Sequence, residues 1–467
     1  MRTKSLIFTI VVLSFLVSLL PSSAFVYLGT NALIETRKSV LVKTLSEAQI
    51  EDLGAFHNFF GPSLGGFWTE QHYVNEAVTV DCLLILKTLN ALGSVNVNRA
   101  IEYIACKQYQ RDTGAGGFGA YFEGDGTFQG CNLYTTYEVV RCLKAFNSLD
   151  MINQTLLMDF ITKRYNGTIG SFQELITVVD GKEYAHGGFP LPFRSFKSHI
   201  AYAMPNIITT YAGVCALKEL ERLDLINTTK TYEWIMHCQA ANGMFKPYPD
   251  ASYMPLPDWS PLKTNPFEVD RYGTAIPYTF AAISALNALG RLGNISAEDK
   301  QRIKDYIANC QTRGGPVYVH QDYDRWSTSH TYEAVMILHD LDILNESQII
   351  VNKINEYFQE TQMLVLDETS LIPTPGSEEY GLHCSDATPP GDSNYAIAVF
   401  NATGNMHLLD QPTPRVQKTW LNLIVLSAII TILTGATAIG VLKIQKWRSK
   451  PEASETPETQ TPPSVVT

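Results

Sequence analysis

The chain has 467 residues, a formal net charge of −11 at pH 7 and a sequence pI near 5.4. This acidic balance excludes a protein built to bind nucleic acid, because such proteins present a basic face to the phosphates. With 45% hydrophobic and 17% charged residues, the composition is that of a globular chain long enough for a large core.

Apolar segments lie near both ends of the chain. Residues 1–24 combine a basic start, an apolar run and a small-residue end, which is typical of a secretory signal peptide; an uncleaved anchor is the alternative. Residues 420–442 are apolar and long enough to cross a bilayer, and the basic residues that follow predict a cytoplasmic C-terminus. Residues 443–467 are rich in Pro, Thr and Glu and are expected to be disordered. The sequence thus predicts a type I single-pass protein of the cell membrane whose bulk is extracellular.

An internal repeat organises the middle of the chain. Five segments share a Thr, usually an apolar or aromatic residue after it, and a Leu seven places further on; they begin at Thr79, Thr136, Thr210, Thr279 and Thr331. Together with an apolar residue three places after the Leu, this pattern predicts one helix in each repeat.

Each repeat helix is expected to lead through a short turn into a second amphipathic helix. Glycine-rich turns at residues 115–119, 242–245 and 313–316 then return the chain to the next repeat. The sequences Gly-Gly-Phe at 65–67 and His-Gly-Gly-Phe at 186–189 are expected to precede the first and third repeats in the same way. Residues 39–54 are predicted to supply one further helix of the second type.

The order of Gln, Gly-Gly-Phe, Thr-aromatic and two Leu residues resembles the repeats of prenyltransferase β subunits and of squalene and terpene cyclases. The resemblance spans roughly residues 40–360. It implies an all-α fold, an α/α toroid of about five to six helical hairpins around a central cavity, which we expect over residues 30–360. A small β-rich appendage or stalk is predicted at 361–419, because residues 363–373 and 394–410 alternate like short strands, followed by one C-terminal transmembrane helix.

In protein prenyltransferases an Asp-x-Cys pair at the start of one inner helix and a His at the start of the next hold a zinc ion. His330 occupies the place that the resemblance gives to the His, but the Asp and Cys would fall at Ala275 and Pro277. One imidazole does not make a zinc site, so we predict no metal and no cofactor. The acids with which terpene cyclases protonate their substrates are also missing, since the nearest string, residues 322–324, lacks the paired following acids.

Acidic residues recur two places after the repeat Thr. Asp81, Glu138 and Glu333 share this register, where the other two repeats have Ala212 and Ala281. Carboxyl groups at one end of a cavity are suited to general acid–base chemistry when their pKa values differ. The alternative is that acids favour helix N-termini because they meet the positive end of the helix dipole. The catalytic candidates are Glu138, Glu333, His330 and Asp81.

Two long insertions, residues 167–206 and 243–278, are rich in aromatic residues and proline. Because they lead back into inner helices, they are expected at a mouth of the ring, either as a ligand-binding lid or as packing over the ring. The candidate ligand-binding residues are Phe189, Phe193, Tyr253 and Trp259.

Eight cysteines and six Asn-x-Ser/Thr sequons agree with an oxidising, extracellular location. Two cysteine pairs straddle a predicted hairpin turn and are predicted to form disulfides, Cys82–Cys106 and Cys215–Cys238. For the other four we expect Cys131–Cys142 and Cys310–Cys384, but the sequence leaves their pairing open. N-glycosylation is predicted at the sequons, with helix capping by Asn as the alternative; they begin at Asn153, Asn166, Asn227, Asn294, Asn345 and Asn401.

Three functions stay open at this point. The first is a non-catalytic, membrane-tethered module that binds a ligand or another surface, which the missing zinc ligands favour. The second is a prenyltransferase- or cyclase-like enzyme that acts on an isoprenoid or lipid, which the aromatic insertions favour. The third is a glycan-acting enzyme that uses Glu138 and Glu333. The expected ligand is therefore a lipid, an isoprenoid or a glycan, and the sequence identifies no protein partner.

Overall fold

The computed structural model describes residues 36–57, 76–110, 114–119, 131–174, 176–179, 182–185, 205–249, 275–318, 326–362 and 389–412. Residues 36–411 form one compact unit. Within its described part, twelve α-helices account for most of the regular structure and six short strands for the remainder.

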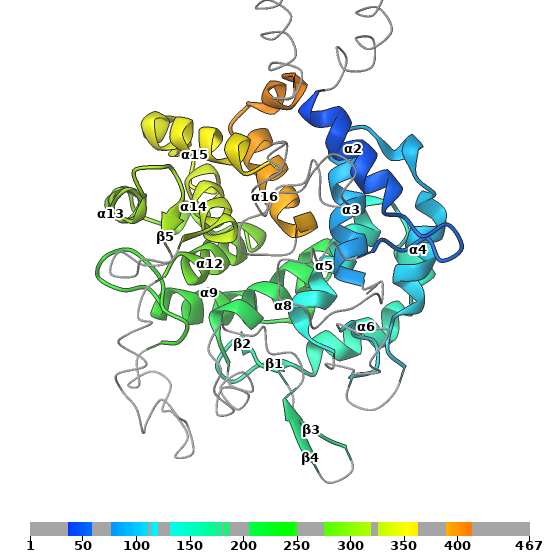
Figure 1. Ribbon diagram of the computed structural model, residues 1–467. Coiled ribbons are helices and arrows are strands. Elements are labelled where there is room, and N and C mark those ends of the chain that lie inside the picture. Colours follow the sequence, from blue (N-terminus) through cyan, green and yellow to red (C-terminus); the bar gives the residue numbers. More distant parts are fainter. Residues whose placement is uncertain are drawn as a thin grey trace, which may run out of the picture. The chain divides into compact units, whose positions relative to one another are not determined.

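Six inner helices form a closed ring. In chain order they are α3 (Glu76–Thr88), α5 (Leu133–Ala145), α8 (Ile207–Glu219), α12 (Ile276–Ala288), α14 (Thr328–Asp340) and α16 (Pro389–Ala402). Each packs against the next, and α16 packs against α3, which closes the ring (Figure 1). Helices α5 and α14 therefore lie across the ring from each other, because two inner helices separate them on either side.

Outer helices alternate with the inner ones along the chain. They are α2 (Arg37–Glu47), α4 (Val97–Cys106), α6 (Gln154–Thr162), α9 (Thr228–His237), α13 (Ala297–Cys310) and α15 (Gln348–Thr361). Each outer helix and the inner helix that follows it make one hairpin, so the described chain contains six hairpins (Figure 1). The α/α toroid expected from the sequence is confirmed.

The repeated Leu anchors each inner helix to the core. All five are fully buried in one continuous hydrophobic cluster: Leu86, Leu143, Leu217, Leu286 and Leu338. Full burial of one leucine side chain contributes about 1.5–3 kcal/mol. The periodicity that predicted these helices is therefore the same periodicity that holds them in place.

The repeated Thr fastens the turn that enters its own helix. Its hydroxyl oxygen accepts a hydrogen bond of 3.0–3.3 Å from a buried backbone N–H of that turn, in the pairs Thr79 with Phe56, Thr136 with Phe118, Thr210 with Phe172, Thr279 with Phe245 and Thr331 with Val317. A buried N–H without an acceptor would cost about 1–3 kcal/mol. This requirement explains why the same hydroxyl recurs in every repeat.

The turn from an outer to an inner helix needs a glycine. In the second repeat Gln108 donates to the carbonyl oxygen of Gly116 at 3.1 Å, and Gly116 has a φ of +94°. A Cβ atom at Gly116 would lie 2.0 Å from the carbonyl oxygen of Leu156, so no other residue fits there. The corresponding turns of the first and third repeats contain Gly54 and Gly170. Their assignment to residues 65–67 and 186–189 was wrong, and those residues lie outside the described part of the chain.

The turn from an inner to an outer helix follows a second rule. Eleven places after the Thr, the backbone adopts a left-handed conformation with φ between +55° and +69°, at Asn90, Asn147, Glu221, Gly290 and Asp342. A short 3-10 turn follows in each repeat: η2 (Leu92–Ser94), η4 (Leu149–Met151), η5 (Leu223–Leu225), η6 (Leu292–Asn294) and η7 (Leu344–Ser347). The predicted sequons at Asn153, Asn227, Asn294 and Asn345 lie at these turns.

The described strands form three antiparallel pairs in the connections between hairpins. They are β1 (Tyr165–Asn166) with β2 (Ser171–Phe172), β3 (Ile176–Val179) with β4 (Lys182–Ala185), and β5 (Val317–Tyr318) with β6 (Trp326–Ser327). The register places Tyr165 opposite Phe172 and Tyr318 opposite Trp326. The first two pairs precede α8 in the chain and the third precedes α14, and they form no larger sheet among the described residues.

The strands predicted at residues 394–410 are wrong. The chain there forms α16 and the 3-10 turn η8 (Met406–Asp410). Ala396, Ile397, Val399 and Phe400 are buried, and this spacing makes one face of a helix, not of a strand. Residues 363–388 of the predicted appendage lie outside the described residues.

Helix α16 is a sixth repeat in altered form. Ser393 stands in the place of the Thr, Phe400 in the place of the Leu, and Gly404, with a φ of +71°, at the left-handed position. Among the described helices none is long and apolar enough to cross a membrane. The predicted signal peptide, transmembrane helix and tail, at 1–24, 420–442 and 443–467, fall outside the described residues.

Seven cysteines lie in the described part of the chain, and the predicted Cys82–Cys106 and Cys215–Cys238 disulfides are not formed there. The thiols of the second pair point in different directions. The Cys215 thiol lies 3.9 Å from the carbonyl oxygen of Ser284 on α12, whereas the Cys238 thiol points back to the carbonyl oxygen of Trp234 in its own helix. The predicted Cys131–Cys142 disulfide is not formed either, and Cys384, the predicted partner of Cys310, lies outside the described residues.

Candidate active site

The inner helices present one face to the interior of the ring. Their other faces are buried against neighbours, whereas residues spaced three or four apart along one stripe keep part of their surface accessible. On five of the six inner helices the stripe includes Asp81 and Leu84; Tyr134, Glu138 and Arg141; Pro277, Phe280 and Ser284; Ser329, Glu333 and Met336; and Tyr395 and Ala398. These side chains line the centre of the ring.

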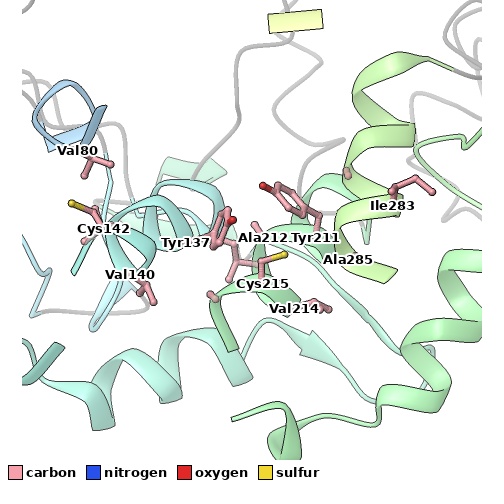
Figure 2. Close-up of a cluster of buried hydrophobic side chains, with 14 of the residues drawn as sticks. Val80, Tyr137, Val140, Cys142, Tyr211, Ala212, Val214, Cys215, Ile283 and Ala285 are labelled. Atoms are coloured by element: carbon pink, nitrogen blue, oxygen red, sulfur yellow. The ribbon is translucent and has the colours of Figure 1, made fainter. Parts of the chain in front are cut away.

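An aromatic belt runs around this lining. The ring centroids of Tyr137 and Tyr211 are 5.3 Å apart, and Tyr211 and Phe280 follow at 5.7 Å. Phe280 and Tyr332 are also 5.7 Å apart, and Tyr332 stacks on Tyr395 at 4.9 Å. Figure 2 shows the start of the belt, where Tyr137 and Tyr211 lie next to each other above Cys215. The belt joins α5, α8, α12, α14 and α16, and offers flat apolar faces to a ligand.

Glu138 lies on α5, where one turn of helix brings it to Arg141. The guanidinium Nη2 of Arg141 donates to the Glu138 carboxylate at 2.5 Å. The side chain of Glu138 is 18% exposed and that of Arg141 is 32% exposed. Burial raises the pKa of Glu138, and the charge and hydrogen bond of Arg141 oppose that rise. Arg141 thus stabilises the ionised form of Glu138.

Asp81 lies on α3, the inner helix that packs between α5 and α16. The amide Nδ2 of Asn394 donates to Asp81 Oδ1 at 2.8 Å. Burial raises the pKa of Asp81 to about 7, and the charge of Glu138 adds to the rise, while Arg141 and Asn394 oppose it. Asp81 therefore titrates near neutral pH and is coupled to Glu138.

Glu333 lies on α14, across the ring from Glu138. Its Oε2 is buried and has no hydrogen-bond partner among the residues that the structure describes. Burial alone raises the pKa of Glu333 to about 8, so the carboxyl group is mostly protonated at neutral pH. No described cation counteracts this rise, since the residue one turn further along α14 is Met336.

His330 lies in the first turn of the same helix. Ser327 caps α14, and its hydroxyl oxygen accepts the backbone N–H of His330 at 3.0 Å. The imidazole Nδ1 is buried and bonds to none of the described residues, and burial lowers the pKa of His330 to about 4. The side chain is therefore neutral at physiological pH.

The structure brings all four catalytic candidates onto the lining, on α3, α5 and α14. It also adds residues that the sequence did not single out as site residues: Arg141, Asn394 and the aromatic belt. The ion pair between Glu138 and Arg141 could have been predicted from the sequence, because residues three apart on a helix are neighbours. Asn394 had no such signal, because α16 was not recognised as an inner helix.

The predicted ligand-binding residues Phe189, Phe193, Tyr253 and Trp259 lie outside the described residues. Among the sequons, Asn153 and Asn227 cap α6 and α9 through their side-chain oxygens, as the alternative explanation required. Asn166 accepts the backbone N–H of Thr168, and Asn294, Asn345 and Asn401 are exposed. Capping uses the amide oxygen, so glycosylation of these residues stays a prediction.

Comparisons with known proteins agree with the toroid. The family model of the prenyltransferase alpha-alpha toroid domain matches residues 15–189, 145–254 and 267–378, which together span more than half of the chain. A comparison with curated protein sequences gives no match.

Solved structures show the same fold at low identity. Cellobiose 2-epimerase from Bacillus thermoamylovorans has a TM-score of 0.50 and 10% identity, over 81% of this chain and 99% of that chain. Candida albicans protein geranylgeranyltransferase-I complexed with GGPP has a TM-score of 0.46 and 15% identity, over 75% and 91%. A type II terpene cyclase from Scytonema, in complex with geranylgeranyl dihydroxybenzoate, has a TM-score of 0.44 and 16% identity, over 80% and 96%. At these identities the similarity concerns the fold alone.

The zinc site of protein prenyltransferases does not fit this chain. Ala275 is the N-cap of α12 and Pro277 is in its first turn, and neither carries a ligating side chain. Within the described residues, no three His, Cys, Asp or Glu side chains group closely enough to hold a metal ion. His330 therefore keeps the position of a ligand without the partners that tetrahedral zinc requires.

Proposed function

Because the chain belongs to the prenyltransferase alpha-alpha toroid domain family, we propose that it encloses its ligand in the ring and acts on it there by acid–base chemistry. The proposed reaction is hydrolysis of a glycosidic bond, and the proposed substrate is a carbohydrate. Glu333 is the general acid and Glu138 the general base. This is the third of the functions that the sequence left open.

The observation that carries the proposal is a pair of carboxyl groups in one register with opposite surroundings. Burial raises the pKa of both carboxyl groups, but Arg141 opposes the rise at Glu138, whereas burial acts unopposed on Glu333 and raises its pKa to about 8. Two carboxyl groups whose environments push their protonation states apart are what acid–base catalysis at neutral pH requires.

Their placement suits a ligand held between them. Glu138 and Glu333 lie on α5 and α14, which are opposite helices of the ring. In this proposal a sugar in the centre meets the acid on one side and the base on the other. In hydrolysis with inversion, the acid protonates the departing oxygen while the base takes a proton from the attacking water on the opposite face of the sugar. The aromatic belt supplies faces on which a sugar ring stacks.

A second candidate, isoprenoid binding, is favoured by the same belt and by the family. The belt is apolar on its faces and surrounds the site with five aromatic side chains. Proton-initiated cyclisation of an isoprenoid is less well supported, because a raised pKa makes Glu333 a weaker acid, and an alkene is a poor proton acceptor. Protonation of an oxygen suits a carboxyl group of this strength better.

The test is turnover of a disaccharide panel that includes cellobiose by the full-length protein. Glu333→Gln and Glu138→Gln are expected to lower kcat about 100- to 10,000-fold, the usual contribution of a general acid or base. The matched control is Glu346→Gln, since Glu346 is exposed at 60% in η7 and pairs with Lys304; its kcat is expected to be unchanged. Hydrolysis that persists in Glu333→Gln contradicts the proposal. Binding of farnesol with no saccharide turnover supports the second candidate, and no ligand at all supports a surface interaction module.

We also propose that the toroid is held outside the cell by a C-terminal membrane anchor. Residues 1–24 and 420–442 support this through their composition, and the exposed sequons are compatible with it. Protease treatment of intact cells tests the orientation: loss of the toroid with protection of residues 443–467 is expected. A protein released by alkaline washing of the membrane, or a toroid protected from protease, contradicts it.

A further inference from the structure

Two buried polar atoms on α14 have no hydrogen-bond partner among the described residues, His330 Nδ1 and Glu333 Oε2. Buried side-chain polar atoms in proteins are almost always hydrogen-bonded, so each exception requires an explanation. Leaving such an atom unsatisfied costs about 1–3 kcal/mol. Two exceptions on one helix, both on or beside the lining of the ring, are consistent with one shared partner, which we take to be a bound ligand.

The spacing of the two residues brings them together. Residues three apart on a helix are neighbours, with Cβ atoms about 5–6 Å from each other. Helical side chains also lean toward the N-terminus, which directs Glu333 over the turn that carries His330. Nevertheless neither open atom bonds to the other residue, so both stay available to a further hydrogen-bonding group.

The rest of this end of α14 is fixed. Ser327 caps the helix, its hydroxyl lies 2.8 Å from that of Ser329, and Thr328 hydrogen-bonds to Asp392 on α16. Immediately beside Glu333, Tyr332 stacks on Tyr395 at 4.9 Å. His330 Nδ1 and Glu333 Oε2 therefore lie on a helix end that several hydrogen bonds hold in place, close to the stacked rings of Tyr332 and Tyr395. This combination suits a binding site.

The chemistry of the two groups selects a hydroxyl. Glu333 is mostly protonated near pH 7 and His330 is neutral, so the pKa shifts leave little charge to attract an ion. A neutral imidazole Nδ1 donates or accepts according to its tautomer, and so does each oxygen of a carboxylic acid. A hydroxyl group both donates and accepts, so it satisfies either arrangement, whereas a carboxylate only accepts and an ammonium only donates.

We propose that His330 and Glu333 form one uncharged subsite that binds neighbouring hydroxyl groups of a neutral sugar whose ring stacks on Tyr332 and Tyr395. This deepens the proposed function and rests on it, because it assigns to the acid Glu333 a second role in substrate recognition. It also gives His330 a role without metal. A neutral saccharide, and not an acidic or amino sugar, is the substrate class that this subsite selects.

Binding of cellobiose and of glucose to the full-length protein tests the subsite apart from turnover. His330→Ala is expected to weaken cellobiose binding about threefold to tenfold, the loss of one neutral hydrogen bond of 0.5–1.5 kcal/mol. His330→Gln, which keeps a polar atom, is expected to lose less. The matched control is His339→Gln on the same helix, since His339 is 48% exposed and contacts Asp340; its affinity is expected to be unchanged.

Nuclear magnetic resonance of nitrogen-15-labelled histidine supplies a second readout. Cellobiose is expected to shift the imidazole nitrogens of His330 and not those of His339, and zinc added alone is expected to shift neither. Unchanged affinity in His330→Ala, a response of His330 to zinc but not to saccharide, or no saccharide binding at all overturns the subsite. Saccharide binding that depends on His330 without hydrolysis supports the subsite and refutes the proposed reaction, so the two failures are distinguishable.

Discussion

Glu138 and Glu333 are the same residue in the same register of two inner helices, and they differ in one neighbour. Three places after Glu138 the chain has Arg141, and three places after Glu333 it has Met336. The first carboxyl group is ion-paired at 2.5 Å, and the second has a buried oxygen without a partner. The comparison teaches that the repeat determines where a carboxyl group lies, whereas its neighbour one turn away determines whether the rise in pKa caused by burial is opposed.

Glu174 differs from Glu333 in that both of its carboxyl oxygens have hydrogen-bond partners. It bonds to Arg164 at 3.0 Å and accepts the backbone N–H of Leu133 at 2.7 Å, and the two side chains are 1% and 0% exposed. Glu174→Ala is expected to lower the free energy of unfolding by about 3–5 kcal/mol, because it leaves a buried guanidinium unpaired. Urea unfolding measures this loss.

The control for Glu174→Ala is an exposed ion pair of the same kind. Asp224→Ala removes the partner of Arg222, and these side chains are 65% and 38% exposed. A much smaller loss is expected there, because water screens exposed pairs. Equal losses at Glu174 and Asp224 contradict the view that burial and partners decide the value of a carboxylate in this fold.

Exchange of the two neighbours tests the comparison directly. Arg141→Met removes the cation beside Glu138 and is expected to raise the pKa of Glu138 by about 1–3 units, the usual effect of an opposite charge at this distance. Met336→Arg is expected to lower the pKa of Glu333 from about 8 by a similar amount. Carboxyl titration by carbon-13 nuclear magnetic resonance measures both. A pKa of Glu333 that does not move in Met336→Arg contradicts the comparison.

The raised pKa of Glu333 makes the free energy of unfolding depend on pH. A carboxyl group with a folded pKa of about 8 binds its proton more tightly when folded, so its contribution to stability is complete below the unfolded pKa of about 4.3. That contribution is lost as the pH rises to about 8, with a slope of at most about 1.4 kcal/mol per pH unit. Glu333→Gln is therefore expected to stabilise the protein at pH 7 by about 1–3 kcal/mol and to change nothing at pH 4.

Glu138→Gln supplies the contrast to that result. It removes the partner of Arg141 and is expected to destabilise the protein at pH 7, because a half-buried cation loses its ion pair. Urea unfolding at several pH values measures both variants. Destabilisation by Glu333→Gln at pH 7 would contradict a raised pKa of Glu333.

The smallest effect concerns Asn394, which holds Asp81 from α16. Asn394→Leu removes a hydrogen bond of 2.8 Å and is expected to cost about 0.5–1.5 kcal/mol and to raise the pKa of Asp81 further above about 7. Carboxyl titration shows the shift. A pKa of Asp81 that stays in place means that burial and Glu138 alone determine it.

Much of the ring was predictable, because its rules are local. The Thr and the Leu seven places later mark five inner helices, since each Thr accepts a buried N–H and each Leu fills the core. The sixth inner helix was missed because it has Ser393 in the place of the Thr and Phe400 in the place of the Leu. Its alternating apolar run was mistaken for a strand, and only closure of the ring against α3 identifies it as a helix of the inner circle.

The candidate site was predictable in part. Register placed Asp81, Glu138 and Glu333 at one level, which needed only the repeat. The charge state of each carboxyl group was not predictable, because it depends on burial and on neighbours such as Asn394 that come from distant parts of the chain. The cysteine pairing failed for a related reason: symmetric spacing about a turn says nothing about the direction in which each thiol points.

The central claim is that Glu333 keeps its proton to higher pH than Glu138 does, because only Glu138 has a described cation beside it. Infrared difference spectroscopy of the full-length protein at pH 7 tests it most directly, through the stretching band of protonated carboxyl groups. We expect Glu333→Gln to remove more intensity from this band than Glu138→Gln does. Loss of the band in Glu138→Gln, with no change in Glu333→Gln, would contradict the assignment of acid and base.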